Sequence, residues 1–231
     1  TAGARPPEAE IGIMADLQGP RIRTRNKTPM PIIKDEIVWV SELPKKKTAD
    51  HKKNKFIFID LKNIVKLVKI GSDILIEDGL IKIKVLDKTK SSLKCEVIDG
   101  GIVKHHKGVN IPGISGLLSA LTLKDKEVLD FGLSQDVDFI AMSFVRTAGE
   151  IKKLKSLIKK KYKKGGIVRQ VIAKIERKEA IKNFDEILKA TDAVMVARGD
   201  LGVEMPQSDL PILQKEIIAK CLKAGKPVIV A

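Results

Sequence analysis

The stretch that decides the fold runs from Ile167 to Ala197 and reads IVRQVIAKIERKEAIKNFDEILKATDAVMVA. It begins with a run that ends at Glu176 and contains the apolar residues Val171 to Ala173, continues with an amphipathic segment over about 179–190, and closes on an apolar run. Short, continuously apolar runs are typical of strands buried on both faces, and apolar residues three and four positions apart indicate a helix. The stretch therefore predicts a strand–helix–strand unit of a parallel sheet.

The same alternation continues in both directions along the chain. Buried strands are predicted at about 11–16, 139–143, 170–175, 193–198 and 227–231. Helices are predicted over 148–164 and 179–190, after a cap at Ser208, and from a capping box at Thr122–Asp125 to about Phe131. Five such strands fit either a (β/α)₈ barrel or an open doubly wound sheet, because the sequence does not give the strand order.

Residues 24–108 follow a different pattern. Short apolar runs, rich in β-branched residues, at 37–40, 56–59, 74–76, 80–85 and 93–97 are separated by turn residues such as Asp78-Gly79. This pattern predicts a small all-β module that is inserted into the α/β body.

The composition excludes several classes of protein. Hydrophobic residues make up 43% and charged residues 32% of the 231 residues, which excludes collagen-like, coiled-coil and disordered chains. No apolar run is long enough to cross a bilayer, and Cys95 and Cys221 lie far apart with no CxxC spacing. Because residues 1–10 also show no secretion signal pattern, we expect a cytoplasmic protein with no disulfide framework and no membrane segment.

The net charge of +15 raises the question of a nucleic-acid partner. The basic residues are spread along the chain, and a single Trp and a single Tyr leave few platforms for base stacking. We therefore expect no nucleic-acid binding, and we interpret the charge as a solvated surface that also attracts phosphorylated substrates.

The segment Lys174-Ile175-Glu176 places a cation and a carboxylate on the same side of an extended chain. Because an unpaired buried charge is costly, both side chains need partners. Two interpretations stay open. The pair belongs either to a structural salt-bridge network or to a site where a metal carboxylate stands beside a lysine that neutralises phosphoryl charge.

A second segment, ARGDLGVE at 197–204, follows an apolar strand. Gly199 allows close approach of the backbone to a ligand, and amides near a helix start can hold an anion. Asp200 could share a Mg²⁺ ion with Glu176, since two carboxylates completed by phosphate oxygens and water form a typical magnesium site. The alternative is an ordinary strand-to-helix turn.

A third segment, DLQGPRIRT at 16–24, again follows a buried strand and contains a Gly-Pro turn. Of its two arginines, Arg21 and Arg23, one could reach a phosphate while the other pairs with protein groups.

Together the three segments resemble the pyruvate kinase family. The resemblance runs from about Ile11 to Ala231 and includes further matching stretches: 76–81, 107–113, 121–125, 136–138, 143–146 and 225–231. It implies a partial TIM (β/α)₈ barrel with an inserted small all-β lid domain. In this division residues 1–23 hold the third barrel strand, 24–108 form the lid, and 109–231 hold the fourth to seventh strands.

The resemblance implies Mg²⁺-dependent phosphoryl transfer from phosphoenolpyruvate to ADP, which gives pyruvate and ATP in glycolysis. Lys174 resembles the lysine that stabilises the phosphoryl group in transfer. Glu176 and Asp200 match the Mg²⁺ carboxylates, and the amides of Gly199 and Asp200 match those that hold the substrate carboxylate.

The resemblance also suggests nucleotide and monovalent-cation contacts. Arg23, with a catalytic role, and Lys107 resemble contacts to the nucleotide phosphates, while Asp16 and the Leu17 carbonyl occupy the monovalent-cation site. Arg21 stands where K⁺-dependent members carry Glu, and K⁺-independent relatives carry a basic residue there. The resemblance thus implies that a fixed guanidinium replaces the charge of K⁺.

The family pattern extends beyond both ends of this sequence, so we expect a fragment that is inactive alone and a homotetramer for the complete protein.

Two alternatives are weighed against a kinase. One is another Mg²⁺-dependent aldolase or lyase of the phosphoenolpyruvate/pyruvate barrels, which lack the lid; the other is a truncated, non-catalytic basic binding protein. No residue identifies itself as the proton donor to the enolate.

Overall fold

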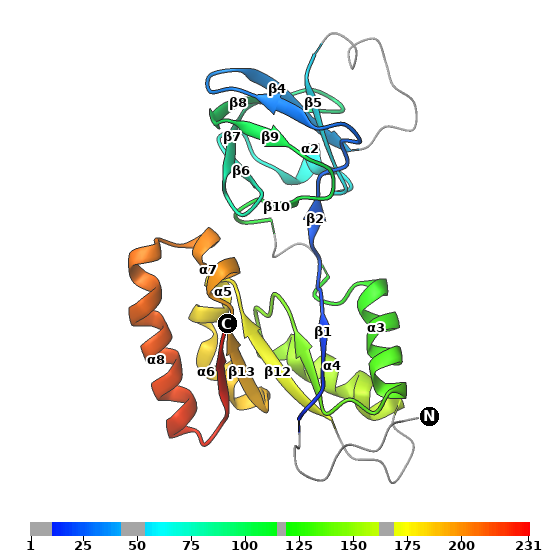
Figure 1. The fold of residues 1–231 in the computed structure, drawn as a ribbon, viewed down its shortest axis with the longest axis vertical. Coiled ribbons are helices and arrows are strands. Elements are labelled where there is room, and N and C mark those ends of the chain that lie inside the picture. Colours follow the sequence, from blue (N-terminus) through cyan, green and yellow to red (C-terminus); the bar gives the residue numbers. More distant parts are fainter. Residues whose placement is uncertain (1–10, 43–53, 115–118, 162–168) are drawn as a thin grey trace. The chain divides into compact units, whose positions relative to one another are not determined.

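The computed structural model describes residues 11–42, 54–114, 119–161 and 169–231 (Figure 1). Contacts divide the chain into two units: Thr1–Pro20 with Ser119–Ala231, and Arg21–Leu118. Within the described ranges, no helix combines the length and the apolar character needed to cross a membrane.

The first unit is built on five parallel strands. They are β1 (Met14–Leu17), β11 (Phe139–Met142), β12 (Gln170–Ile175), β13 (Ala193–Val196) and β14 (Val228–Val230). Their spatial order, β1-β11-β12-β13-β14, is their order in the sequence. A doubly wound sheet reverses its order at a switch point, whereas a (β/α)₈ barrel does not. The predicted partial barrel is confirmed, and the doubly wound alternative is wrong.

Helices alternate with these strands and pack against them (Figure 1). The α-helices are α3 (Leu123–Ser134), α4 (Ala148–Lys161), α5 (Lys178–Lys182), α6 (Phe184–Ala190), α7 (Arg198–Glu204) and α8 (Leu210–Lys223), with a 3₁₀ turn, η2 (Gln207–Asp209), before α8. One buried cluster joins alternate strand residues to the helices, for example Ile140 and Val194 to Leu154 and Ile187. The intervening residues, such as Ile172 and Met195, form a separate small cluster. The two clusters mark the two faces of the sheet, because successive strand side chains point to opposite sides.

The helix predictions differ from the structure in two places. The helix predicted over 179–190 is two helices, α5 and α6, that meet at Asn183. Asp209, not Ser208, is the N-cap of α8, and it makes no side-chain capping bond. The last predicted residues of α4, 162–164, lie outside the described residues.

The capping box of α3 is confirmed. Thr122 Oγ1 accepts a hydrogen bond from the Asp125 amide at 3.1 Å, and Asp125 Oδ2 accepts one from the Thr122 amide at 2.8 Å. The other carboxylate oxygen, Asp125 Oδ1, accepts the Gly19 amide at 3.0 Å. The cap therefore also anchors the backbone just after β1.

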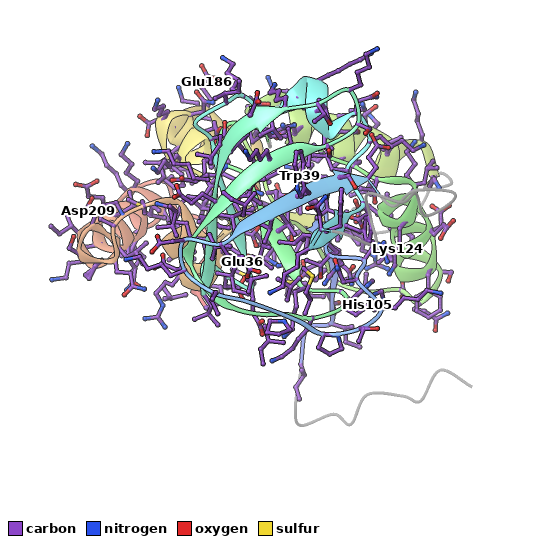
Figure 2. All side chains as sticks on the ribbon, turned by 90° about the horizontal axis from the view of Figure 1, so that it is seen from above. Glu36, Trp39, His105, Lys124, Glu186 and Asp209 are labelled. Atoms are coloured by element: carbon purple, nitrogen blue, oxygen red, sulfur yellow. The ribbon has the colours of Figure 1, made fainter. Side chains whose placement is uncertain are left out.

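The second unit has its own core and is almost entirely β-structure. A seven-stranded sheet has the order β2-β10-β6-β7-β8-β4-β5, and β3 pairs with β9. The strands are β2 (Ile22–Arg23), β3 (Met30–Ile32), β4 (Ile37–Glu42), β5 (Phe56–Ile59), β6 (Asp73–Ile76), β7 (Ile81–Lys88), β8 (Leu93–Asp99), β9 (Gly101–Val103) and β10 (Gly108–Asn110), with one short helix, α2 (Ile64–Leu67). Trp39 of β4, labelled in Figure 2, stacks on Phe56 of β5 with 6.2 Å between ring centroids. The predicted module, 24–108, lies inside this unit.

Candidate active site

The polar residues that follow the apolar strands of the first unit lie side by side. The register pairs Leu17 with Met142 and Met142 with Ala173, so β1 and β11 end level with each other and β12 runs two residues further, to Ile175. By strand alternation, Lys174 shares the face of Ile172, away from the helices. Lys174 and Asp16 lie within hydrogen-bond distance across a sequence separation of 158 residues.

The Lys174 ammonium is surrounded by oxygen atoms. Its Nζ lies 3.0 Å from Asp16 Oδ2, 3.0 Å from Ser143 Oγ and 3.2 Å from Glu176 Oε1. The residue is only 8% exposed. Burial by itself lowers the pKa of Lys174, but the negative charges of Glu176 and Asp16 outweigh it and raise the pKa above its usual value. Lys174 is therefore a fixed cation at neutral pH.

Glu176 is a buried carboxylate with one oxygen bound and one incompletely satisfied. The residue is 0% exposed, and its Oε2 accepts the backbone N–H of Phe144 at 2.7 Å. Oε1 faces Lys174, yet no donor among the described residues is aligned for a hydrogen bond to it. Burial raises the pKa of Glu176, the charge of Lys174 opposes this, and the charge of Asp200 adds to it. The electrostatic influence of Asp200 places a second carboxylate near the first.

These oxygens fit a divalent cation. A buried carboxylate oxygen without an aligned donor is costly, and a cation satisfies it. No group of three or more His, Cys, Asp or Glu side chains with metal-site geometry occurs in the part of the chain that the structure describes. A metal held by Glu176 and Asp200 would thus complete its coordination with water or substrate oxygens, as Mg²⁺ commonly does.

Asp200 lies in the first turn of α7, which starts directly after β13. The amides of a first helical turn have no acceptor within their own helix. A Cβ atom placed on Gly199 would have no neighbour within 4 Å, so space is open beside this backbone. The close approach of a ligand to Gly199 stays a prediction.

Phe144 is a part of the site that sequence reasoning missed. Its backbone has a φ of 55°, in the left-handed region that bulky residues avoid. The Arg177 guanidinium lies over its ring at 4.6 Å from the centroid, and Arg177 is ion-paired with Glu204. A Cβ on Gly19 would approach the Phe144 ring to 2.8 Å, so this position requires glycine. The sequence carries no signal for a left-handed Phe.

The predicted monovalent-cation ligands are engaged within the protein. Asp16 accepts from Lys174 and, at 3.3 Å, from the Ser143 hydroxyl. The Leu17 carbonyl accepts the Ser143 amide at 3.3 Å. The structure shows that Ser143 connects Asp16, Leu17 and Lys174.

Arg23 and Lys107, the predicted nucleotide contacts, belong to the second unit together with Arg21. Arg23 pairs with Gly108 in the β2–β10 register, which brings Arg23 next to Lys107. The Lys107 ammonium lies 2.5 Å from a carboxylate oxygen of Glu77. Arg21 is exposed and precedes β2.

Comparison with known proteins identifies relatives over nearly the whole chain. The family model of the pyruvate kinase barrel domain matches residues 2–231. The chain is 40% identical over 225 residues to the pyruvate kinase of Clostridium perfringens, covering 97% of this chain and 46% of that protein. It is 39% identical over 227 residues to the pyruvate kinase of Staphylococcus haemolyticus, covering 96% of this chain and 37% of that protein. It is also 39% identical over 230 residues to the pyruvate kinase of Geobacillus stearothermophilus, covering 96% of this chain and 37% of that protein. The chain thus spans less than half the length of these relatives.

Proposed function

The chain belongs to the pyruvate kinase family, and from this premise we propose that it supplies the phosphoryl-transfer site of an enzyme that converts phosphoenolpyruvate and ADP to pyruvate and ATP. The observation that carries the proposal is the buried cluster of Lys174, Asp16 and Glu176, with one Glu176 oxygen left without an aligned donor. The ion pair with Lys174 satisfies this oxygen only in part, and a bound Mg²⁺ ion would complete its coordination.

Phosphoryl transfer requires positioning and charge neutralisation more than covalent chemistry by the protein. Lys174 meets the second requirement, because Asp16, Ser143 and Glu176 fix its ammonium at the strand ends. Its charge would stabilise the phosphoryl group as that group passes from phosphoenolpyruvate to ADP. Glu176 and Asp200 would hold Mg²⁺, which when bound neutralises charge on the phosphoryl oxygens.

The remaining contacts are assigned through the family pattern. The amides of Gly199 and Asp200 would hold the substrate carboxylate, in line with the open space beside Gly199. Arg23 and Lys107 would bind the nucleotide phosphates, since a guanidinium and an ammonium suit phosphate oxygens. Both lie in one unit, so their mutual geometry does not depend on the position of the other unit.

The proposed cation requirement rests on the family pattern. Arg21 stands where K⁺-dependent members carry Glu, and we propose that its guanidinium replaces the charge of K⁺, so that the enzyme needs Mg²⁺ and little K⁺. A cytoplasmic location and a homotetrameric complete protein are proposals that rest on the family pattern alone.

The alternative functions have less support. An aldolase or lyase of a related barrel has no counterpart for residues 24–108, whereas the family match includes this segment. A basic binding protein would need its charge at the surface, and it would have no use for a buried Lys174–Glu176 pair.

The test is a coupled assay on the full-length protein. ATP is expected to form only when phosphoenolpyruvate, ADP and Mg²⁺ are all present, and the reaction is expected to stop when a chelator removes the metal. Absence of phosphoenolpyruvate-dependent ATP formation in a folded, full-length preparation would contradict the proposal. Salt-sensitive RNA retention by the same preparation would favour the binding protein instead.

A further inference from the structure

Thr24 is a fully buried polar residue between two arginines. It is 0% exposed, and it directly follows Arg23, the proposed nucleotide contact. A buried hydroxyl is expected to have hydrogen-bond partners, and those partners show what it holds in place.

Within the described residues, the hydrogen bonds of the Thr24 backbone and hydroxyl all go to the segment 104–107. Its Oγ1 donates to the Lys104 carbonyl at 2.6 Å and accepts the Lys107 amide at 2.8 Å. Its backbone N–H donates to the Lys107 carbonyl at 2.9 Å, and its carbonyl accepts the His106 amide at 3.0 Å. These four hydrogen bonds fasten the turn that carries Lys107 to the strand that carries Arg23.

The fastened turn in turn holds the Arg23 side chain. Arg23 Nη1 donates to the carbonyl of His106 at 3.0 Å. His106 has a φ of 63°, a left-handed conformation that a non-glycine residue adopts only when its surroundings hold it there. The Thr24 hydroxyl therefore acts on both proposed phosphate contacts, on Lys107 through its amide and on Arg23 through the conformation of the turn.

A second set of contacts holds Arg23 independently of this hydroxyl. Asp60 Oδ1 accepts the Arg23 amide at 2.5 Å, and Asp60 Oδ2 accepts Arg25 Nη2 at 2.6 Å. The backbone of β2 thus stays in place when the hydroxyl is removed. The Thr24 hydroxyl fixes the position of the turn 104–107, and therefore the spacing between the Arg23 and Lys107 side chains.

We propose that Thr24 is a positioning residue for nucleotide binding, whose hydroxyl sets the spacing of Arg23 and Lys107 so that both cations meet the phosphates of a nucleoside diphosphate. The inference rests on the proposed function. Groups held in the bound geometry beforehand lose less conformational entropy when the ligand binds, so the gain is expected in nucleotide affinity.

Thr24→Val and Thr24→Ser in the full-length protein provide the test. Valine keeps the shape but removes both hydroxyl hydrogen bonds, and we expect the KM for ADP to rise about tenfold with the KM for phosphoenolpyruvate unchanged. Serine keeps the hydroxyl and is expected to restore the wild-type KM for ADP. Calorimetric titration with ADP measures the ADP affinity of the wild type and of both variants directly, without catalytic turnover.

Thr89→Val is the matched control. Thr89 Oγ1 donates to the Ser92 carbonyl at 3.1 Å and accepts the Ser92 amide at 3.0 Å, at the turn between β7 and β8 in the same unit. Thr89→Val loses these two hydrogen bonds, and the contacts of the hydroxyl with the Ser91 amide and the Ser92 hydroxyl, at an exposed residue outside the turn 104–107. A lower melting temperature with an unchanged KM for ADP is expected.

A wild-type ADP affinity in Thr24→Val, or equal ADP effects in Thr24→Val and Thr89→Val, would overturn the inference. If Thr24→Val does not fold, Thr24→Ala replaces it, because alanine also removes both hydroxyl hydrogen bonds and fits in the space of the threonine. A rise in the KM for ADP supports the inference, and an unchanged value overturns it.

If wild-type protein binds ADP but shows no phosphoenolpyruvate-dependent ATP formation, the proposed function fails while the titrations still decide the role of Thr24.

Discussion

Phe144 donates its backbone N–H to Oε2 of Glu176 at 2.7 Å while its own backbone is left-handed, with a φ of 55°. Arg177, the residue after Glu176, lies over the Phe144 ring at 4.6 Å from the centroid. The strand end thus holds Phe144 through a carboxylate at the amide and a guanidinium at the ring. Backbone strain of this kind persists only where several contacts impose it. Here it aims an amide at the proposed metal carboxylate.

The left-handed backbone of Phe144 predicts an inversion of the usual order of Ala and Gly. Both Phe144→Ala and Phe144→Gly lose the buried ring, which costs about 3–5 kcal/mol. Only alanine keeps the strain of a Cβ at positive φ, so Phe144→Gly is expected to be more stable by about 1 kcal/mol. Urea unfolding of the two variants measures the difference.

Leu129, buried in the middle of α3, provides the control for this comparison. In a regular helix, Leu129→Ala is expected to be more stable than Leu129→Gly by about 1 kcal/mol. The same order at position 144 would show that its backbone is not held left-handed.

Replacing Lys174 by Met is expected to remove most of the activity of the full-length protein. Methionine has a similar length but no charge, so the developing phosphoryl charge loses its fixed cation. Loss of one such preorganised group lowers kcat by about 10²–10³-fold. Steady-state kinetics with both substrates saturating measures the effect.

Lys155→Met is the matched variant, because the Lys155 ammonium is also ion-paired in this unit, 2.6 Å from Asp192. Lys155 lies on α4, and its partner Asp192 directly precedes β13, at the opposite ends of the strands from Lys174, so the kcat of Lys155→Met is expected to stay at the wild-type value. Equal activities of the two variants would remove Lys174 from the proposed mechanism.

Burial raises the pKa of the Cys95 thiol to about 12. In the unfolded chain a cysteine ionises near pH 8.5. Because the folded-state pKa is the higher one, the stabilisation is fully present below about pH 8.5 and is lost as the pH rises toward 12. The free energy of unfolding of the wild type, relative to that of Cys95→Val, is therefore expected to fall between these pH values. A difference that does not change with pH would contradict the buried, protonated thiol.

Arg21→Glu is expected to make the full-length enzyme dependent on K⁺. In the wild type the guanidinium supplies positive charge, so turnover in K⁺-free, Na⁺-free buffer is expected to match turnover with K⁺. In Arg21→Glu the charge is reversed, and K⁺ is expected to stimulate turnover by at least about tenfold. Lys34→Glu, an equal charge change at an exposed position of the same unit, controls for net charge. Strong K⁺ stimulation of the wild type would contradict the prediction.

The sequence alone determined the features that depend on neighbours along the chain. The apolar runs located all five barrel strands, but the expected burial holds only for the inner strands β11, β12 and β13. The edge strands β1 and β14 were wrongly expected to be buried, because each has a partner strand on one side only, and Ile13 and Ile229 beside or within them are 51% and 40% exposed. The capping box at Thr122 and Asp125 was readable because its partners are three residues apart. The polar residues at strand ends, Lys174 and Glu176 among them, were visible as interruptions of this pattern.

The short strands β2, β3, β9 and β10 of the second unit were not predicted, because runs of two or three residues are too short to show a period. The break between α5 and α6 at Asn183 was missed as well. There the amphipathic pattern continues through the break, so periodicity cannot reveal where the helix ends.

Only the tertiary structure decided the strand order, the contacts of Lys174 with Asp16 and Ser143, and the left-handed backbone of Phe144. Each of these depends on residues that are distant in sequence and become neighbours when parallel strands align. A local pattern states which residues are buried or extended. It does not state which strand ends meet, and the chemistry of this site arises where they do.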